Sequence, residues 1–360
     1  MYLLVMTVIQ TIRKNLDSKT KEHIILRKDE VPMIVFQKQK DKDFTILNLT
    51  DIHTPREACK DGKIDSEILT YTISELVERV KPDLITVTGD FAYAHGDTTA
   101  YEYASKYLDS FGIPWAPVWG NHDNQAGPEF VDRLVEIYKE GKHILYESGE
   151  ASLGNGNYVI AIEEEGKVVE GLIMMDGHDE MPYVNEKGES VMEWAKLLPE
   201  QMDWYREQVK ALSERGCDDT TMMLHIPIYA YRDAFKAAMR SDIPKDAITP
   251  ELFQSGECWN EGYKDSTGMG LESIGSYPED DGVFEVIKEM KTTKRVITGH
   301  DHVNDWMINY QGVKLIFSLK TGPHSYWRPF MCGGTVLRVT SEGVADVHHE
   351  YVDIMHLLKE

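Results

Sequence analysis

Cysteine is scarce in this sequence, and the few cysteines are scattered. The 360 residues include Cys59, Cys217, Cys258 and Cys332, and no two of them form a Cys-x-x-Cys pair. This pattern argues against a zinc ribbon and against a disulfide scaffold, and it fits a reducing compartment. We therefore expect a cytoplasmic protein.

The sequence has no long hydrophobic run, and its first residues lack the pattern typical of a cleavable leader. No stretch approaches the roughly 20 apolar residues that a membrane-spanning helix needs. The first residues, MYLLVMTVIQTIRKN, contain a short apolar stretch with no basic residue before it and no small-residue cleavage site. We expect neither a signal peptide nor a membrane partner.

Basic residues are outnumbered, with 38 Lys and Arg against 61 Asp and Glu and a formal net charge of -23. Such a surface repels nucleic acid and anionic membranes, so we expect no nucleic-acid partner. Bound cations could neutralise part of this acidity, because metal sites collect carboxylates. The charge leaves the oligomeric state open.

Strands and helices alternate from Phe44 onward. Buried strands are predicted over 44–53, 83–90 and 113–123, with helices over 66–82 and 101–112. This order is typical of an α/β protein with a largely parallel sheet, in which ligands bind at the carboxyl ends of the strands. Residues 1–30 are predicted as an N-terminal extension or an edge strand, and residues 31–360 as a single domain.

The second half of the chain contains further predicted elements. A hairpin is predicted over 156–177, a helix over 198–216, and strands over 220–227 and 294–302. Two polar stretches, 177–195 and 230–280, are predicted as long loops. Loops of that length are often active-site lids.

Five short motifs stand at the ends of predicted strands. In chain order they are DIH at 51–53, GD at 89–90, GNHD at 120–123, LHIP at 224–227 and GHDH at 299–302. Singly each is weak, because a lone histidine after a strand is usually a capped or surface residue. Five in the same position along five strands are improbable by chance.

The residue types in these motifs suit metal ions. Carboxylate, imidazole and amide oxygen are ligands for Mn, Fe, Zn and Co. Two such ions held roughly 3.5–4 Å apart can activate a water and clamp a phosphoryl group. Two cations that close need a bridging carboxylate, and Asp90 is central enough in the motif order to serve.

The five motifs together resemble those of the calcineurin-like metallophosphoesterase superfamily, whose pattern is D-x-H, G-D, G-N-H-[DE], H and G-H-x-H. The resemblance spans Phe44 to Trp306. The segments IPWAPVWGNHD, GNGNYV, LPEQMDWY, LHIP and TGHDHVNDW are similar to a purple-acid-phosphatase-like branch. The resemblance implies an α/β fold in which two mixed β-sheets pack as a sandwich flanked by helices, with a dimetal centre at the strand ends.

The resemblance also implies a ligand set for two divalent or mixed-valence metal ions. The first metal would be held by Asp51, His53, Asp90 and His302. The second metal would be held by Asp90, Asn121, His225 and His300. His122 would bind no metal. It would instead face the phosphoryl oxygens or protonate the leaving alkoxide, with Asp123 fixing its tautomer.

One departure from the family pattern concerns Tyr93. Purple acid phosphatases have G-D-x-x-Y, whose tyrosinate binds ferric iron, and their first motif lacks the histidine. This chain has GDFAY together with DIH, and we favour His53 as the ligand. Tyr93 is then predicted to be a packed aromatic or a neighbour of the substrate, and His95 and His324 are the other candidates for the substrate pocket.

The expected function is a dimetal phosphoesterase that hydrolyses small phosphomonoesters by attack of a metal-bound hydroxide. One alternative is a phosphodiesterase acting on cyclic or small nucleotides. Another is a non-catalytic metal-binding scaffold, as some superfamily members have become. Such members usually lose ligands or the histidine of GNH, and this chain retains both.

Overall fold

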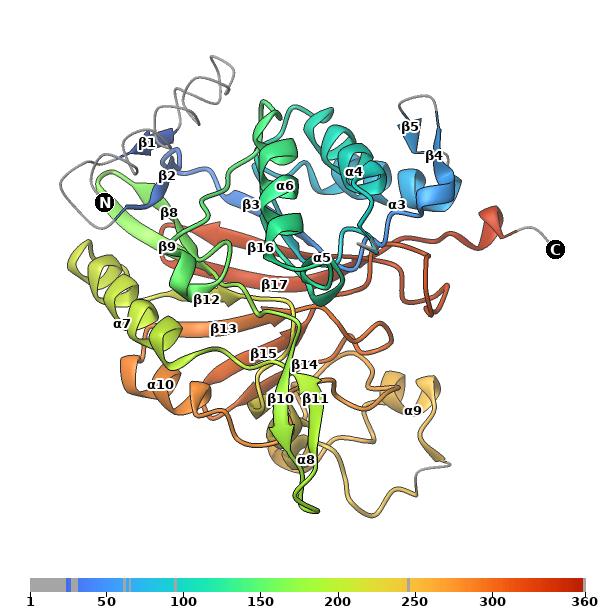
Figure 1. The fold of residues 1–360 in the computed structure, drawn as a ribbon. Coiled ribbons are helices and arrows are strands. Elements are labelled where there is room, and N and C mark those ends of the chain that lie inside the picture. The colour runs from blue at the N-terminus through green and yellow to red at the C-terminus, as the bar shows by residue number, and fades with distance from the viewer. Residues whose placement is uncertain are drawn as a thin grey trace.

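Two β-sheets lie face to face in the computed structural model, with helices on both outer sides (Figure 1). The structure describes residues 24–26, 32–60, 63–64, 66–93, 96–244 and 247–358. The predicted sandwich of two mixed sheets flanked by helices is confirmed. The sequence pattern predicted one largely parallel sheet. The structure instead has a group of parallel strands in each of its two sheets.

The larger sheet has eight strands. In spatial order these are β1 (Ile24–Leu26), β2 (Ile34–Gln37), β8 (Tyr158–Glu164), β9 (Lys167–Met174), β12 (Thr220–Met223), β13 (Thr293–Thr298), β15 (Val313–Phe317) and β14 (Met307–Tyr310). Strands β9, β12, β13 and β15 run parallel to one another. The predicted hairpin is confirmed as β8 and β9, which pair antiparallel.

The smaller sheet has five strands. In spatial order these are β17 (Gly343–Tyr351), β16 (Gly333–Thr340), β3 (Phe44–Leu49), β6 (Leu84–Thr88) and β7 (Trp115–Val118). Strands β3, β6 and β7 are parallel, and β16 joins them antiparallel. All five residues of β6 are buried, because a helical layer covers one face and the other sheet covers the opposite face.

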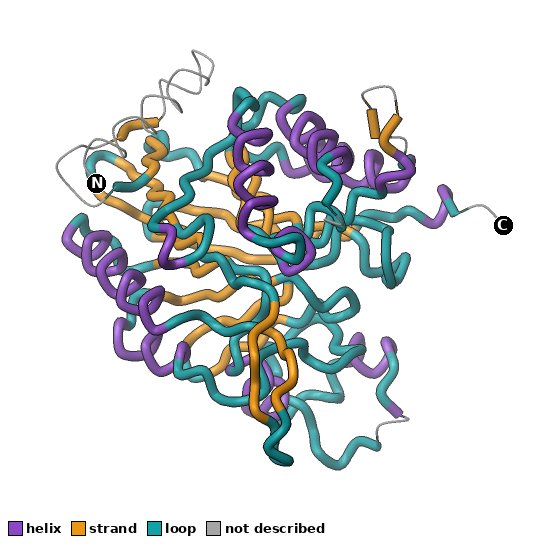
Figure 2. The backbone as a smooth tube through the Cα atoms, viewed as in Figure 1, coloured by secondary structure: helices purple, strands orange, loops and turns teal. Residues whose placement is uncertain are grey.

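The helices form two groups on either side of the sandwich (Figure 2). Those over the five-stranded sheet are α3 (Glu67–Val80), α4 (Thr99–Asp109), α5 (Asn121–Asn124) and α6 (Pro128–Lys139). Those over the eight-stranded sheet are α7 (Pro199–Glu214), α8 (Ala230–Ala238), α9 (Pro250–Ser255) and α10 (Val283–Met290). Short 3-10 turns lie at Arg56–Ala58, Ala151–Leu153, Glu261–Tyr263 and Met355–Leu357.

Two hydrophobic cores result, and the eight-stranded sheet separates them. Successive side chains of a strand point to opposite faces. Along β13, Val296 packs in the core under α7, α8 and α10, whereas Ile297 packs in the core between the sheets. Leu315 and Ile316 of β15 divide in the same way. The strands of this sheet are therefore held in register from both faces, which fixes where their ends lie.

The two predicted long loops are wrong in part. Residues 177–195 contain the hairpin β10 (Glu180–Val184) and β11 (Ser190–Trp194), and residues 230–280 contain α8 and α9. A second two-stranded ribbon is formed by β4 (Cys59–Lys60) and β5 (Lys63–Ile64). Among the described residues, no helix is long and apolar enough to cross a bilayer.

Of the predicted N-terminal extension, only β1 belongs to the described residues. It pairs antiparallel with β2 at the edge of the eight-stranded sheet. The remainder of residues 1–30 lies outside the described ranges. The division of the chain at residue 30 stays a prediction.

Candidate metal centre

The carboxyl ends of five parallel strands, three from one sheet and two from the other, meet at one edge of the sandwich. Each of the five motifs directly follows one of them, namely β3, β6, β7, β12 and β13. The loops lie so close together that a Cβ atom at Gly120 would collide with the Asp90 carboxylate, and one at Gly299 with the Thr50 hydroxyl. Glycine at these two positions allows the side chains of different motifs to converge.

Backbone hydrogen bonds hold the first two motif loops against each other. The amide of Asp51 donates to the carbonyl of Gly89 at 3.1 Å, and that of His53 donates to the carbonyl of Asp90 at 3.0 Å. Asp51, His53, Asp90 and His300 all have positive φ angles, between 45° and 76°. Non-glycine residues in this region cost on the order of 1–3 kcal/mol each, and such strain gathers at functional sites.

The first group of side chains is Asp51, His53, Asp90 and His302. One ligand atom from each lies within 4.8 Å of the others, and all four residues are buried. Nε2 of His53 is 3.2 Å from Nε2 of His302 and 3.5 Å from both Asp51 Oδ1 and Asp90 Oδ2. These atoms are the four predicted ligands of the first metal, and the fold brings all of them together.

The proton positions in this group favour a cation at its centre. Nδ1 of His302 lies 2.9 Å from the carbonyl oxygen of Tyr326, which can only accept, so Nδ1 carries the hydrogen. In neutral His302 the lone pair of Nε2 then faces Asp51 Oδ1 at 3.3 Å. That carboxylate oxygen is buried with no hydrogen-bond partner in the described part of the chain. The lone pairs of His302 Nε2 and Asp51 Oδ1 repel each other unless a proton or a positive ion lies between them.

The second group of side chains is Asp90, Asn121, His225 and His300. Nε2 of His225 lies 3.3 Å from Asp90 Oδ2 and 3.1 Å from Asn121 Oδ1, which is 2.8 Å from Nδ1 of His300. Nδ1 of His225 is 2.7 Å from the carbonyl oxygen of Thr88, so this nitrogen carries the hydrogen. The other ring nitrogen is again turned toward oxygen acceptors, and Asp90 belongs to both groups.

The charges of these groups are strongly coupled. Burial would lower the pKa of His225, but the Asp90 carboxylate outweighs burial and raises that pKa to about 9. Burial, reinforced by neighbouring positive groups, lowers the pKa of His53 and of His300 to about 3. Although burial opposes it, the facing histidines hold the pKa of Asp51 and of Asp90 well below its usual range. The centre therefore offers ionised carboxylates and, in His53 and His300, neutral imidazoles, the forms that bind metals. His225 would release its proton when a metal binds.

The predicted contact between His122 and Asp123 is wrong. Nδ1 of His122 lies 2.8 Å from Gln125 Oε1, whereas both Asp123 oxygens accept from backbone amides. Residues three apart share a face of a helix and adjacent residues do not, so on α5 the partner of His122 is Gln125. Nε2 of His122 is 3.9 Å from Asp90 Oδ2, at the border of the first group.

Asp123 has a different place in the structure. Its Oδ2 accepts from the amides of Gly120 and Asp90 at 2.8 Å, and its Oδ1 accepts from Phe91 at 3.0 Å. Burial, and after it the neighbouring Asp90, raises the pKa of Asp123 to about 8. Asp123 thus ties the loop after β6 to the start of α5 and positions the residues around it.

Two of the three predicted pocket residues line one hollow beside the centre. The Tyr93 ring lies 4.9 Å from that of His53, 4.1 Å from that of His122 and 5.8 Å from that of His324. The hollow has a volume of about 250 Å³. It is lined by Thr54, Pro55, Arg56, Glu57, Tyr93, Asp97, Ala100 and His324. His95, the third predicted residue, lies outside the described residues.

Sequence reasoning missed several residues that adjoin the centre. Nζ of the buried Lys320 donates to the carbonyl oxygen of Asp51 at 3.0 Å. The rings of Trp194 and Tyr326 lie 4.5 Å and 4.2 Å from those of His300 and His302. Nothing in the local sequence of these three residues signals the contact, because each lies on a loop or hairpin distant along the chain.

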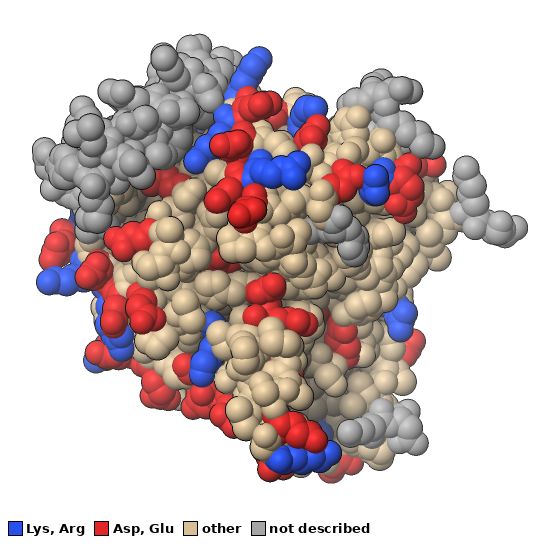
Figure 3. All heavy atoms as spheres, in the orientation of Figure 1, with Lys and Arg blue, Asp and Glu red and all other residues tan. Residues whose placement is uncertain are grey.

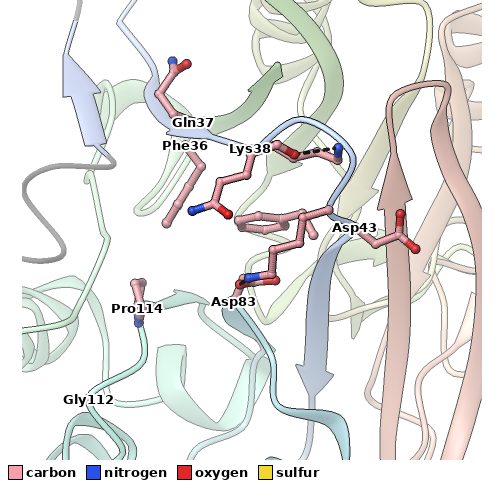
Figure 4. Close-up of a pocket in the computed structure, with 10 residues that line it drawn as sticks. Phe36, Gln37, Lys38, Asp43, Asp83, Gly112 and Pro114 are labelled. Atoms are coloured by element: carbon pink, nitrogen blue, oxygen red, sulfur yellow. Dashed lines mark hydrogen bonds and ion pairs between the residues drawn. The ribbon is translucent and has the colours of Figure 1, made fainter. Parts of the chain in front are cut away.

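A second hollow lies at the opposite ends of β3 and β6 (Figure 4). Its volume is about 230 Å³, and its charged lining residues include Lys38, Lys42 and Asp83. Lys38 pairs with the buried Glu164, and Lys42 lies 3.4 Å from Asp83. These pairs neutralise the lining without a ligand, so this hollow offers no metal site.

Comparison with known protein families identifies the group to which this arrangement belongs. A family model described as calcineurin-like phosphoesterase matches residues 44–304. The chain belongs to the calcineurin-like phosphoesterase family. This match covers all five motifs and confirms the predicted superfamily.

Two relatives and one solved structure are similar to this chain. "Probable inactive purple acid phosphatase 28" of Arabidopsis thaliana is 24% identical over 337 residues, covering 84% of this chain and 77% of its own. A "Probable cyclic nucleotide phosphodiesterase" of Xenorhabdus bovienii is 31% identical over 134 residues, 35% of this chain and 49% of its own. A dimetal phosphatase from Danio rerio is 13% identical, with 86% and 98% coverage and a TM-score of 0.48. The resemblance to a purple-acid-phosphatase-like branch is confirmed.

Proposed function

We propose that this protein is a dimetal phosphoesterase that hydrolyses small phosphomonoesters. The observation that carries the proposal is the pair of ligand groups that share Asp90. Each contains a histidine whose outer nitrogen donates to a backbone carbonyl and whose inner nitrogen faces oxygen acceptors. The six candidate ligands besides Asp90 exceed the four that a tetrahedral site takes, so they are too many for one such ion.

The metals and the chain would divide the chemistry between them. Bound divalent ions supply Lewis-acid activation of water and of the phosphoryl group. The first ion would be held by Asp51, His53, Asp90 and His302, and the second by Asp90, Asn121, His225 and His300. The backbone carbonyls of Thr88 and Tyr326 orient two of these imidazoles, as is usual for metal-bound histidine.

His122 would handle the proton of the leaving group. Its Nδ1 donates to Gln125 Oε1, so Nε2 is the free ring nitrogen, and in the imidazolium form Nε2 carries the proton that would pass to the departing alkoxide. Its side chain is 22% exposed, whereas those of the candidate ligands around it are nearly or fully buried. His122 is therefore accessible to substrate, and Gln125 sets its tautomer.

The substrate class follows from the surroundings of the centre. A net charge of -23 discourages polyanions such as nucleic acid, while two cations attract a small phosphate. A monoester offers the metal pair one more oxygen than a diester does, so it gains more from the pair. We propose a small phosphorylated substrate, with no nucleic-acid or membrane partner.

Two alternatives have a specific observation behind them. One relative has a name that describes it as a cyclic nucleotide phosphodiesterase, and another has a name that describes it as inactive. The complete set of candidate ligands together with His122 favours catalysis over a scaffold, since scaffolds lose such residues. The acidic surface favours a small monoester over a nucleic acid.

The test is a rate comparison with each of four metals. The protein is stripped and reloaded with Mn, Zn, Co or Fe, and kcat/KM is measured for p-nitrophenyl phosphate, bis-p-nitrophenyl phosphate and cyclic nucleotides. We expect the monoester to be preferred with at least one metal. Preference for a diester with every metal would establish the phosphodiesterase alternative. No hydrolysis by a protein shown to contain metal would establish the scaffold.

A further inference from the structure

One face of the β10–β11 hairpin carries a strip of apolar side chains between Glu180 and Ser190 and extends to the metal centre. Residues directly opposite each other in an antiparallel pair, and residues two apart along a strand, share a face. Trp194 pairs with Glu180 and Met192 pairs with Pro182, so Trp194, Met192 and Pro182 share one face, and Val184 follows on it. Val184 is 64% exposed and Met192 is 56% exposed.

The opposite face of the hairpin anchors it to the body of the protein. Tyr183 stacks edge-on against Tyr277 at 5.7 Å, and its hydroxyl donates to Glu279 at 2.9 Å. The apolar face is consequently held outward. In Figure 3 the surface over the hairpin is mostly uncharged between charged side chains at its two ends. An outward apolar strip on so acidic a protein is a candidate binding surface.

Trp194 connects this face to the second ligand group. Its ring meets the His300 ring edge to face at 4.5 Å, and Nδ1 of His300 is 2.8 Å from Asn121 Oδ1. The hairpin therefore begins beside the candidate metal ligands and leads away from them. The indole is the part of the hairpin that borders the candidate ligands.

We propose that Trp194, with Met192 behind it, forms the wall against which the leaving group packs, so that the enzyme favours phosphomonoesters of flat, apolar, uncharged alcohols. The inference rests on the proposed phosphoesterase function. An aromatic group gains both from burial against the strip and from ring contact with the indole. Glu180, exposed and directly opposite Trp194 in the register, repels a negatively charged leaving group.

The experiment compares phenyl phosphate with 2-naphthyl phosphate on the metal-loaded full chain. The two leaving alcohols have similar acidity, so a difference in KM reports the apolar area and not the intrinsic reactivity. We expect a lower KM for the naphthyl ester, and we expect Trp194→Ala to reduce this advantage by about three- to tenfold. The inhibition constant of inorganic phosphate, which has no leaving group, should be unchanged.

A second variant separates specificity from support of His300. Met192→Ser should also narrow the KM difference, although Met192 lies two residues along the strand from Trp194 and further from the centre. Met355→Ser alters an equally exposed methionine on the 3-10 turn Met355–Leu357 and should leave both KM values unchanged.

Three outcomes distinguish the claims. Equal KM values for the two esters in the native protein would overturn this inference and leave the proposed function standing. An equal rise of both KM values in Trp194→Ala, with no effect of Met192→Ser, would show that Trp194 only supports His300. Failure of the native, metal-loaded protein to hydrolyse either ester would overturn the proposed function, and this inference with it.

Discussion

The protein buries acidic side chains at both ends of its parallel strands and neutralises them differently at the two ends. At the amino ends of β9, β12 and β13, Glu170 is paired with Arg295 at 3.0 Å and accepts from Thr221 at 2.8 Å. Glu163 is paired with Arg215 nearby at 2.5 Å. Each of these carboxylates has a cation from the chain itself.

At the carboxyl ends the carboxylates face imidazoles. Asp51 and Asp90 lie against histidines, two of which present an unprotonated nitrogen when neutral. The buried ammonium of Lys320 donates to the backbone oxygen of Asp51 and not to its carboxylate. A buried charge without a protein counterion is costly. The comparison teaches that arginines balance the carboxylates at the amino ends, whereas at the carboxyl ends Asp90 faces a protonated His225, whose proton a bound metal ion would displace.

Matched isosteric substitutions at the amino and carboxyl ends of the strands have the largest expected difference in effect. Asp90→Asn removes the carboxylate shared by both ligand groups, so we expect activity at background level and metal lost from both sites. Glu170→Gln should leave metal content and kcat unchanged. Elemental analysis and a phosphatase assay check both variants. Full metal content in Asp90→Asn would contradict the shared role of Asp90.

His122→Ala separates the proposed general acid from the candidate metal ligands at the carboxyl ends of the strands. We expect kcat to fall by about 10²–10⁴-fold, the usual contribution of a general acid. Metal content should be unchanged, because His122 Nδ1 is bound to Gln125 and its other nitrogen is 3.9 Å from Asp90. Loss of metal in this variant would make His122 a ligand.

Arg295→Met tests the amino end, where the cation belongs to the chain. Removing the partner leaves Glu170 buried and unpaired, which costs about 3–5 kcal/mol of unfolding free energy. Metal content and the activity of the folded fraction should stay at native values. Urea unfolding measures the free energy of unfolding, and elemental analysis measures the metal content. A stability loss that added metal reverses would show that the two ends are not independent.

Tyr93→Phe has the smallest expected effect. Because His53 lies in the first group and Tyr93 packs against its ring, the iron-loaded native protein should show no tyrosinate-to-iron absorption band. Burial raises the pKa of Tyr93, which keeps its phenol protonated. Visible spectra of both proteins check this. A purple preparation that Tyr93→Phe bleaches would make Tyr93 a ligand.

The strand ends and their motifs could be predicted because the change from apolar to polar residues that marks them lies within a few neighbouring positions of the sequence. A buried run such as that before Asp51 has to become polar where the sheet ends, and parallel strands end at the same edge. The helices α3 and α7 were predicted from a single apolar stripe each. Five motifs in the family order then led to both ligand groups.

The features that could not be predicted depend on contacts between residues distant in sequence or on short secondary-structure elements. Gln125, Lys320 and Trp194 acquire their neighbours only when the chain folds. The hairpin β10–β11 was predicted as loop because it forms a separate two-stranded sheet with one exposed face, and its residues show weak alternation. The pairing of His122 with Asp123 was wrong because adjacent residues on a helix turn point apart.

Anomalous X-ray diffraction from crystals of the metal-loaded protein tests the central claim most directly. We predict two peaks per chain, one among Asp51, His53, Asp90 and His302, and one among Asp90, Asn121, His225 and His300. A single peak, with His225 and His300 beyond coordination distance from any ion, would contradict the account.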